Sequence, residues 1–328
     1  MACCAADENL PIISNEIIQS SYDTKYQVDQ GKISRAVDDI VKACKGLGTD
    51  EKKLINTTAD CSNMERDAVS ELYTQKYNKT LHDLFKSELS GNLEKLFIGM
   101  YTNRYVFWAE QIKEAVKGAG TDEKKLIDLL VSTGSEYAEV DRVYTQIYKK
   151  CIYETLSSEC GNSCWGKLMK AWITNQKTAG TPLSIAESLQ KAAKGMGTNE
   201  KTFINLLTTT DSATYQQVDE IYNRLYHKPL RNVIKAEFSG KAEYAFLAVH
   251  DYLLQPARFV ANMLHLAVKG LGTNDDKIVY TTVLHCNTFA PCIKAAYKVM
   301  GFGNIKKALK GDLSGKYERS VLTFWQLM

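Results

Sequence analysis

The chain has few of the residues that interrupt helices. Only 5 of its 328 residues are Pro and 20 are Gly, and this composition favours a mainly helical protein. Long apolar runs are also missing, since the longest, residues 244–249, is far below the ~18 residues of a membrane span. The first residues lack the basic and apolar regions of a secretory signal, so we expect a cytoplasmic protein.

An excess of charge of one sign and catalytic histidine patterns are also missing. Lys and Arg number 41 against 38 Asp and Glu, which is too balanced for a nucleic-acid binder with a broad basic surface. The 9 cysteines are an odd number scattered along the chain, and we expect reduced thiols. The 5 histidines form no metalloprotease pair, and no nucleophile elbow is present. We therefore predict no nucleic-acid binding, no enzyme activity and no catalytic residue.

One short block occurs four times. It consists of Lys, Gly, a variable residue, Gly, Thr and two polar residues, and the first glycines lie 72, 77 and 75 residues apart. A Tyr follows the second Gly after 24 or 25 residues, and 15 residues later comes an acid. These acids are Glu88, Glu159, Glu237 and Asp312. The recurrence predicts four repeats of one structural unit.

Apolar residues between these marks follow helical spacing. Ile33, Val37, Ile40 and Cys44 fall on one face of a helix that should end at the glycines. Thr49 is then expected to cap the next helix, and further helices are expected over 68–77, 81–88 and 93–101. We predict about five helices per repeat.

The domain organisation follows from this count. We expect an amino-terminal tail over 1–20 and a linker over 177–183, where Pro and Gly lie between the second and third repeats. The four repeats are expected over 21–103, 104–176, 184–256 and 257–328. The linker predicts that the chain groups as two halves.

The loop and the acid can be interpreted in two ways. Each Gly-x-Gly-Thr could be only a tight turn, and each acid only a surface carboxylate. Because the pair recurs four times, it also suggests a cage in which loop carbonyls and one carboxylate surround a cation. Such hard oxygen ligands suit Ca²⁺ better than Mg²⁺, and one carboxylate leaves vacant positions for an anion such as a lipid phosphate.

Residues around the loops fit a lipid partner. A Lys precedes the first Gly in every repeat, at Lys45, Lys117, Lys194 and Lys269, and could be attracted to an anionic leaflet. Three of the four loop tips carry a large apolar residue: Leu47, Met196 and Leu271. The fourth tip is Ala119. These lysines could instead be ordinary charges at helix carboxyl ends, with the tips packed locally.

The fourfold block and its distal acid resemble the annexin family over residues 20 to 328, and the chain is similar to a divergent protist annexin of the alpha-giardin type. The resemblance implies an all-α protein in which four repeats of about five helices each pack as a curved disc in two halves. It also implies calcium-dependent binding to acidic phospholipid at the inner face of membranes. Self-association on membranes and a cytoskeletal or flagellar location are further expectations.

Candidate calcium ligands follow from the resemblance. Each site would use three main-chain carbonyls and the distal carboxylate. The four sets are Cys44, Gly46, Gly48 and Glu88; Val116, Gly118, Gly120 and Glu159; Ala193, Gly195, Gly197 and Glu237; and Val268, Gly270, Gly272 and Asp312. The second repeat fits least well, because Glu159 lies one residue early relative to Gly120.

Secondary calcium positions are also implied, each with one carbonyl and one nearby acid. They are Thr49 with Glu51, Thr121 with Glu123, Thr198 with Glu200, and Thr273 with Asp275. The same acids are also favourable first-turn charges of the next helix. The alternative for the whole protein is a helical scaffold that binds cytoskeletal partners without calcium, with the glycine turns serving only the architecture.

Overall fold

The structure is a computed structural model that describes residues 28–46, 48–118, 120–178, 180–194 and 197–328. The described residues form helices and loops without any strand, which confirms the all-α prediction. Within the same ranges, no helix is long and apolar enough to cross a bilayer. The predicted tail over 1–20 lies outside the described residues.

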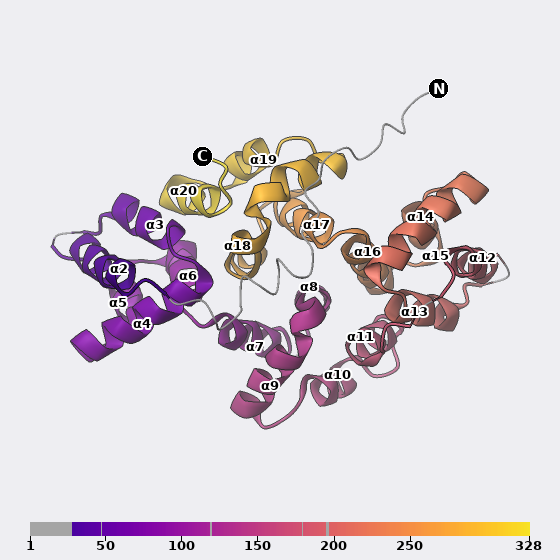
Figure 1. Cartoon of the computed structure of the whole chain (residues 1–328), viewed down its shortest axis with the longest axis horizontal. Helices are drawn as coiled ribbons and strands as arrows, with labels where there is room; N and C mark the ends of the chain where they lie inside the picture. Colours follow the sequence, from indigo (N-terminus) through magenta and orange to yellow (C-terminus); the bar gives the residue numbers. More distant parts are fainter. Residues whose placement is uncertain (1–27, 47, 119, 179, 195–196) are drawn as a thin grey trace. The chain divides into compact units, whose positions relative to one another are not determined.

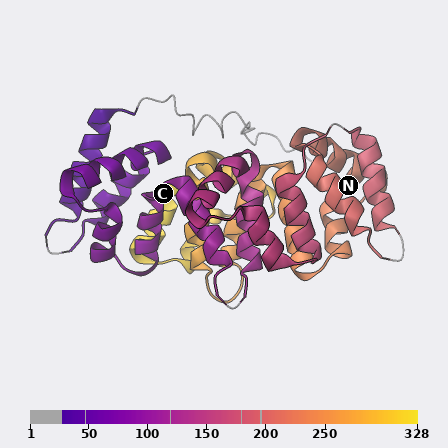
Figure 2. The same cartoon turned by 90° about the horizontal axis from the view of Figure 1, so that it is seen from below.

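The first repeat contains five helices, as the sequence predicts. They are α2 (Gln30–Ala43), α3 (Glu51–Ala59), α4 (Asn63–Tyr77), α5 (Leu81–Glu88) and α6 (Gly91–Met100) (Figure 1). Figure 2 shows these indigo and purple helices bundled side by side. The apolar face read from the sequence is buried, since Val37 and Ile40 of α2 have no exposed surface. As predicted, α5 ends at Glu88, so this acid lies in the last turn of the helix.

The second and third repeats follow the same plan. The second repeat contains α7 (Arg104–Ala115), α8 (Glu123–Thr133), the short 3₁₀ helix η1 (Gly134–Glu136), α9 (Tyr137–Tyr148), α10 (Ile152–Cys160) and α11 (Cys164–Thr174). The third contains α12 (Pro182–Ala193), α13 (Glu200–Thr209), α14 (Ser212–Tyr226), α15 (Leu230–Glu237) and α16 (Gly240–Leu254).

The fourth repeat departs from five helices. Its elements are α17 (Pro256–Val268), α18 (Asp275–Val299), α19 (Ile305–Asp312) and α20 (Gly315–Phe324). The 25-residue α18 replaces the two helices that α3 and α4 form in the first repeat. In the first repeat a capping box at Ser62 and Glu65 starts a new helix. No acid lies between Asp276 and Asp312, so α18 has no such capping pair and continues past the corresponding point.

The repeats form two compact units, but the linker does not divide them. Of the described residues, one unit holds 28–107 together with 260–328, and the other holds 108–259. The first repeat is therefore grouped with the fourth, through packing of α6 on α18 and α20 on α3. The second is grouped with the third, and the linker lies inside that unit, where the Thr178 amide donates to the Thr209 carbonyl. The chain forms two groups of repeats, as expected, but the linker does not separate them. The helix faces that pack together decide which repeats belong to one unit.

The cap of the helix after each loop is also different from the prediction. The capping residue is the polar residue that follows the Thr. Its side chain accepts a hydrogen bond from a main-chain N–H of the first turn. These residues are Asp50, Asp122, Asn199 and Asn274. The Thr of each loop is therefore available for another partner.

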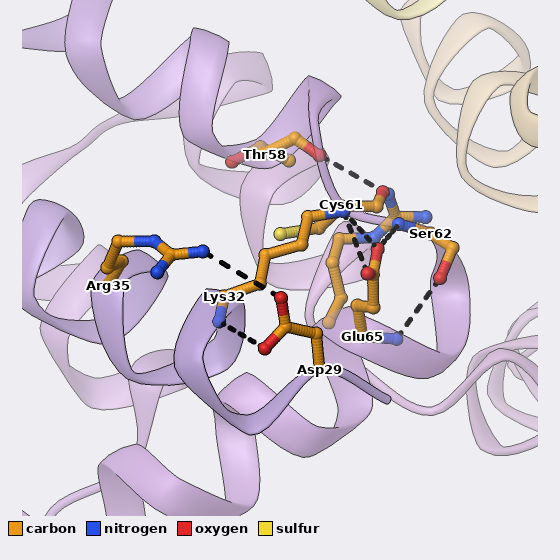
Figure 3. A network of polar contacts seen from close by, with 8 residues as sticks. Asp29, Lys32, Arg35, Thr58, Cys61, Ser62 and Glu65 are labelled. Carbon is orange, nitrogen blue, oxygen red and sulfur yellow. Dashed lines mark hydrogen bonds and ion pairs between the residues drawn. The ribbon is translucent and has the colours of Figure 1, made fainter. Parts of the chain in front are cut away.

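An ion pair supports the turn between α3 and α4 (Figure 3). Lys32 Nζ on α2 lies 2.7 Å from a carboxylate oxygen of Glu65 on α4. The Glu65 carboxylate also accepts a hydrogen bond from the Ser62 amide. Burial acts to raise the pKa of Glu65, but the hydrogen bonds from Lys32 and Ser62 outweigh it and lower the pKa. The ionised carboxylate thus fastens the first turn of α4 to α2.

Candidate metal centres

The glycines of the four loops adopt a backbone conformation that other residues avoid. The φ angle is +119° at Gly46 and +85° at Gly48. The described glycines of the other loops, Gly118, Gly120, Gly197, Gly270 and Gly272, also have positive φ. A Cβ at any of them would meet open space, so the backbone angle and not crowding requires glycine. Gly195, Leu47, Ala119 and Met196 lie outside the described residues.

One main-chain hydrogen bond closes all four loops. The amide of the capping residue donates to the carbonyl of an Ala in the preceding helix, at 2.7 Å from Asp50 to Ala43 and 2.8 Å from Asn274 to Ala267. The corresponding bonds in the other repeats join Asp122 to Ala115 and Asn199 to Ala192. The first candidate ligand of each site is the next residue after that Ala: Cys44, Val116, Ala193 or Val268. The loops therefore share one backbone plan.

The structure brings the distal carboxylates of the first and third repeats to their loops. Thr49 Oγ1 lies 3.1 Å from Glu88 Oε2 and 3.4 Å from the Glu88 carbonyl oxygen. Thr198 Oγ1 lies 2.6 Å from Glu237 Oε2 and 3.2 Å from the Glu237 carbonyl oxygen. Both carboxylates are half-buried. The loop Thr thus holds the end of the distal helix beside the glycines.

The second repeat reaches the same contact despite its shorter spacing. Thr121 Oγ1 donates to Glu159 Oε2 at 2.7 Å, although Glu159 is exposed. The missing residue is absorbed where α8 continues directly into η1 at Gly134. A Cβ on Gly134 would collide with the Tyr252 hydroxyl, so this tight join depends on glycine. Glu159 therefore keeps its place relative to the loop.

The fourth repeat differs at the carboxylate. Thr273 Oγ1 lies 3.3 Å from the Asp312 carbonyl oxygen, and no bond to the Asp312 side chain is seen among the described residues. Asp has one methylene fewer than Glu, and Asp312 is exposed. The helix end is therefore in place, while the carboxylate is not held.

The donor set of each candidate site is oxygen only. Within the described ranges no three His, Cys, Asp or Glu residues gather, so each site offers one acidic side chain plus main-chain carbonyls. Cys44 is buried, and burial followed by the charge of Glu88 raises the pKa of its thiol to about 11. A protonated thiol is a poor ligand for a hard cation, so the carbonyl is the donor that Cys44 offers here. This chemistry fits a hard cation such as Ca²⁺.

Two of the secondary acids already have a cationic partner, which no local sequence pattern indicates. Lys316 at the start of α20 forms an ion pair with Glu51 on α3, and Lys241 at the start of α16 forms one with Glu123 on α8. The hydrogen bond from Lys241 lowers the pKa of Glu123. The partners lie 265 and 118 residues apart in sequence, so only their shared fourfold position could have indicated the pairing.

The third secondary acid, Glu200, has a different partner. Burial and the neighbouring carboxylate of Glu200 raise the pKa of the Cys164 thiol, at the start of α11, to about 12. In the fourth repeat the Asp275 carbonyl lies 3.4 Å from the Tyr317 hydroxyl.

The residues predicted to touch lipid are exposed where they are described. Lys45, Lys117, Lys194 and Lys269 are all exposed. Leu271 at the tip of the fourth loop is fully exposed and borders an open hollow of about 560 Å³ with Lys269, Gly272 and Thr273. A large apolar side chain that no described residue covers is suited to an apolar partner.

Two of the described histidines have aromatic surroundings. His250 is buried, and its Nδ1 lies 2.9 Å from the Tyr215 hydroxyl. His265 stacks on Phe302 with ring centroids 3.8 Å apart. These aromatic contacts account for the two side chains as packing residues.

Comparison with known proteins agrees with the repeat pattern. The family model described as Annexin matches residues 36–100, 107–177, 184–249 and 258–324. The chain belongs to the annexin family. Annexins generally bind phospholipid in a calcium-dependent manner and are generally not enzymes.

Individual annexins are similar along most of this chain. Annexin A7 of Dictyostelium discoideum is 32% identical over 86% of the chain, which spans 62% of that protein. Annexin A4 of Bos taurus is 30% identical over 86% of the chain and 90% of its own length. Among solved structures, calcium-bound alpha-14 giardin is 26% identical with a TM-score of 0.82, covering 89% of this chain and 99% of that one. The predicted likeness to annexins and alpha-giardins is confirmed.

Proposed function

We propose that this annexin binds acidic phospholipid membranes through Ca²⁺ held between each glycine loop and its distal carboxylate. The observation that carries the proposal is the contact between loop Thr and distal Glu in three repeats. The contact spans 38 or 39 residues of sequence and joins the two parts that a cation site would need.

Each part of the site would have a defined task. The positive-φ glycines would let loop carbonyls turn toward a cation, and the carboxylate would supply the single negative charge. A bound Ca²⁺ would supply a positive centre with vacant positions for phosphate oxygens of lipid. With one carboxylate per site we expect weak calcium affinity in the absence of lipid, because ligand charge tunes that affinity.

The exposed lysines and Leu271 would add to membrane binding. Each Lys beside the loops contributes roughly 1 kcal/mol near an anionic leaflet. Leu271 would enter the headgroup boundary from the fourth loop. The protein would then lie reversibly at the inner face of membranes.

Co-sedimentation with phosphatidylserine vesicles across a calcium titration tests the proposal. The variant Glu88→Gln, Glu237→Gln, Asp312→Asn keeps side-chain size and removes three ligand charges. A matched control, Glu71→Gln, Glu187→Gln, Glu220→Gln, removes three exposed helical charges elsewhere. We expect the wild type and the control to sediment with calcium, and the site variant to require far more.

Two outcomes would contradict the proposal. If the wild type never sediments with vesicles, the loops are architectural and a protein partner, such as a cytoskeletal polymer, becomes the better explanation. If the site variant and the control behave alike, lipid binding does not use these carboxylates.

A further inference from the structure

Two ion pairs occupy equivalent places in the two units. Glu51 and Glu123 are the first residues of α3 and α8, directly after their loops. Lys316 and Lys241 are the second residues of α20 and α16. In each pair the lysine comes from the repeat that packs against the loop, so the fourth repeat reaches the first, and the third reaches the second.

The same position carries a neutral residue in the other two repeats. It is Trp165, the second residue of α11, in the second repeat, and Cys164 just before it lies near Glu200 at the start of α13, whose carboxylate contributes to the raised pKa of the Cys164 thiol. It is Asn92, the second residue of α6, in the first repeat, and α6 packs on α18, which begins at Asp275. The second residue of this helix is thus a lysine where it faces Glu51 and Glu123. It is neutral in the two repeats that pack against the loops with Glu200 and Asp275.

Stability alone does not explain these lysines. A positive side chain in the first turn of a helix is unfavourable with respect to the helix dipole. The lysine side chains are 60% and 53% exposed, and ion pairs so exposed contribute little to the free energy of unfolding. The ammonium neutralises the carboxylate that a secondary metal cation would need as its charged ligand.

We propose that Lys316 and Lys241 act as built-in counterions that exclude Ca²⁺ from the secondary positions of the first and second repeats, and that only Glu200 and Asp275 remain open to secondary calcium. This inference rests on the proposed function, because it concerns the acids beside the same loops. It assigns a specificity role to one helix position and divides four similar repeats into two kinds.

Equilibrium dialysis of the full chain with radioactive calcium, without lipid, tests the inference. The double variant Lys241→Gln, Lys316→Gln should bind two more calcium ions per chain at saturation than the wild type, and each single variant one more. The control Lys191→Gln, Lys298→Gln changes the net charge equally at exposed lysines, one in each unit, and should leave the number unchanged.

The reciprocal variants introduce the counterion. Cys164→Lys and Asn92→Lys should each lose one bound calcium ion, so the inference is testable even if a glutamine variant folds poorly. An unchanged number in both sets, with thermal unfolding like that of the wild type, overturns the inference while the wild type still binds calcium. Failure of the proposed function has a separate signature: the wild type binds no calcium and no vesicles.

Discussion

The first and fourth repeats share one unit and one loop plan, yet they hold their acids differently. Glu88 is half-buried and its carboxylate lies beside Thr49, whereas Asp312 is exposed and Thr273 reaches only its main-chain oxygen. The difference is one methylene group. It indicates that the backbone alone builds the loop, while side-chain length decides whether the carboxylate is positioned before a cation arrives.

The same two repeats differ in their middle helices. The first repeat stops α3, starts α4 at the Ser62 capping box and ties it to α2 through Lys32 and Glu65. The fourth repeat continues as α18 with Pro291 inside it. Local capping residues, and not the repeat pattern, therefore set the helix count.

The largest expected effect comes from removing each ligand charge separately. Glu88→Gln should raise the calcium concentration for half-maximal vesicle binding more than about tenfold, because even changes next to metal ligands cost ~10–100-fold in affinity. Asp312→Asn should raise it clearly less, since its carboxylate is not held by Thr273. Vesicle co-sedimentation compares the two, and an equal shift would remove the distinction between the repeats.

The hydroxyl that positions the carboxylate gives the next effect. Thr49→Val keeps the shape but removes the donor to Glu88, and should weaken calcium binding in the first repeat about tenfold, at the low end of the ~10–100-fold range. Thr273→Val is the matched control, because it loses only a contact to a main-chain oxygen. Calorimetric calcium titration measures both. Similar losses in the two variants would show that the Thr serves the loop and not the carboxylate.

The capping box of the first repeat should contribute to the free energy of unfolding and to its dependence on pH. Glu65→Gln should lower the free energy of unfolding by about 1 kcal/mol at neutral pH. The pKa of Glu65 is lowered from its ordinary value of 4.5, so its contribution is present above that value and is lost as pH falls through the folded pKa.

Denaturant unfolding at several pH values measures this effect. The wild type should lose stability relative to Glu65→Gln only on the acid side. The control Glu71→Gln lies on the exposed face of the same helix and should follow the wild type. A gap between Glu65→Gln and the wild type that stays constant with pH would argue against the ion pair as its source.

The smallest effect is a gain. Asp312→Glu restores the missing methylene, and the longer side chain should reach Thr273 as Glu88 reaches Thr49. One added hydrogen bond contributes ~0.5–1.5 kcal/mol, so calcium binding in the fourth repeat should tighten roughly threefold. Calorimetry detects the change, and weaker binding would indicate that the short acid is the better fit there.

Much of the architecture can be predicted because it depends on local residue patterns that recur in the four repeats. Helical spacing located α2, and the predicted range 81–88 agrees with α5. Fourfold spacing linked each loop to an acid, and three Thr to Glu contacts across 38 or 39 residues agree with that link. Recurrence carries long-range information that a single loop does not.

The remainder depends on contacts between repeats, which no local pattern encodes. The grouping of the first repeat with the fourth follows from packed helix faces, and the pairs of Lys316 and Lys241 follow from that grouping. The sequence alone favours Thr49 over Asp50 as the capping residue without good reason, because both residue types cap helices well and they are neighbours. The structure distinguishes them because the Thr49 hydroxyl bonds to the distal carboxylate of Glu88, which leaves Asp50 to cap the helix.

The most direct test is anomalous diffraction from crystals of the full chain grown with calcium. The account predicts ions between the loop carbonyls and the distal carboxylates, with Glu88 and Glu237 among the ligands. It also predicts no ion at Glu51 or Glu123 while their lysines are present. Ions bound only away from the glycine loops, or none at saturating calcium, would contradict the account.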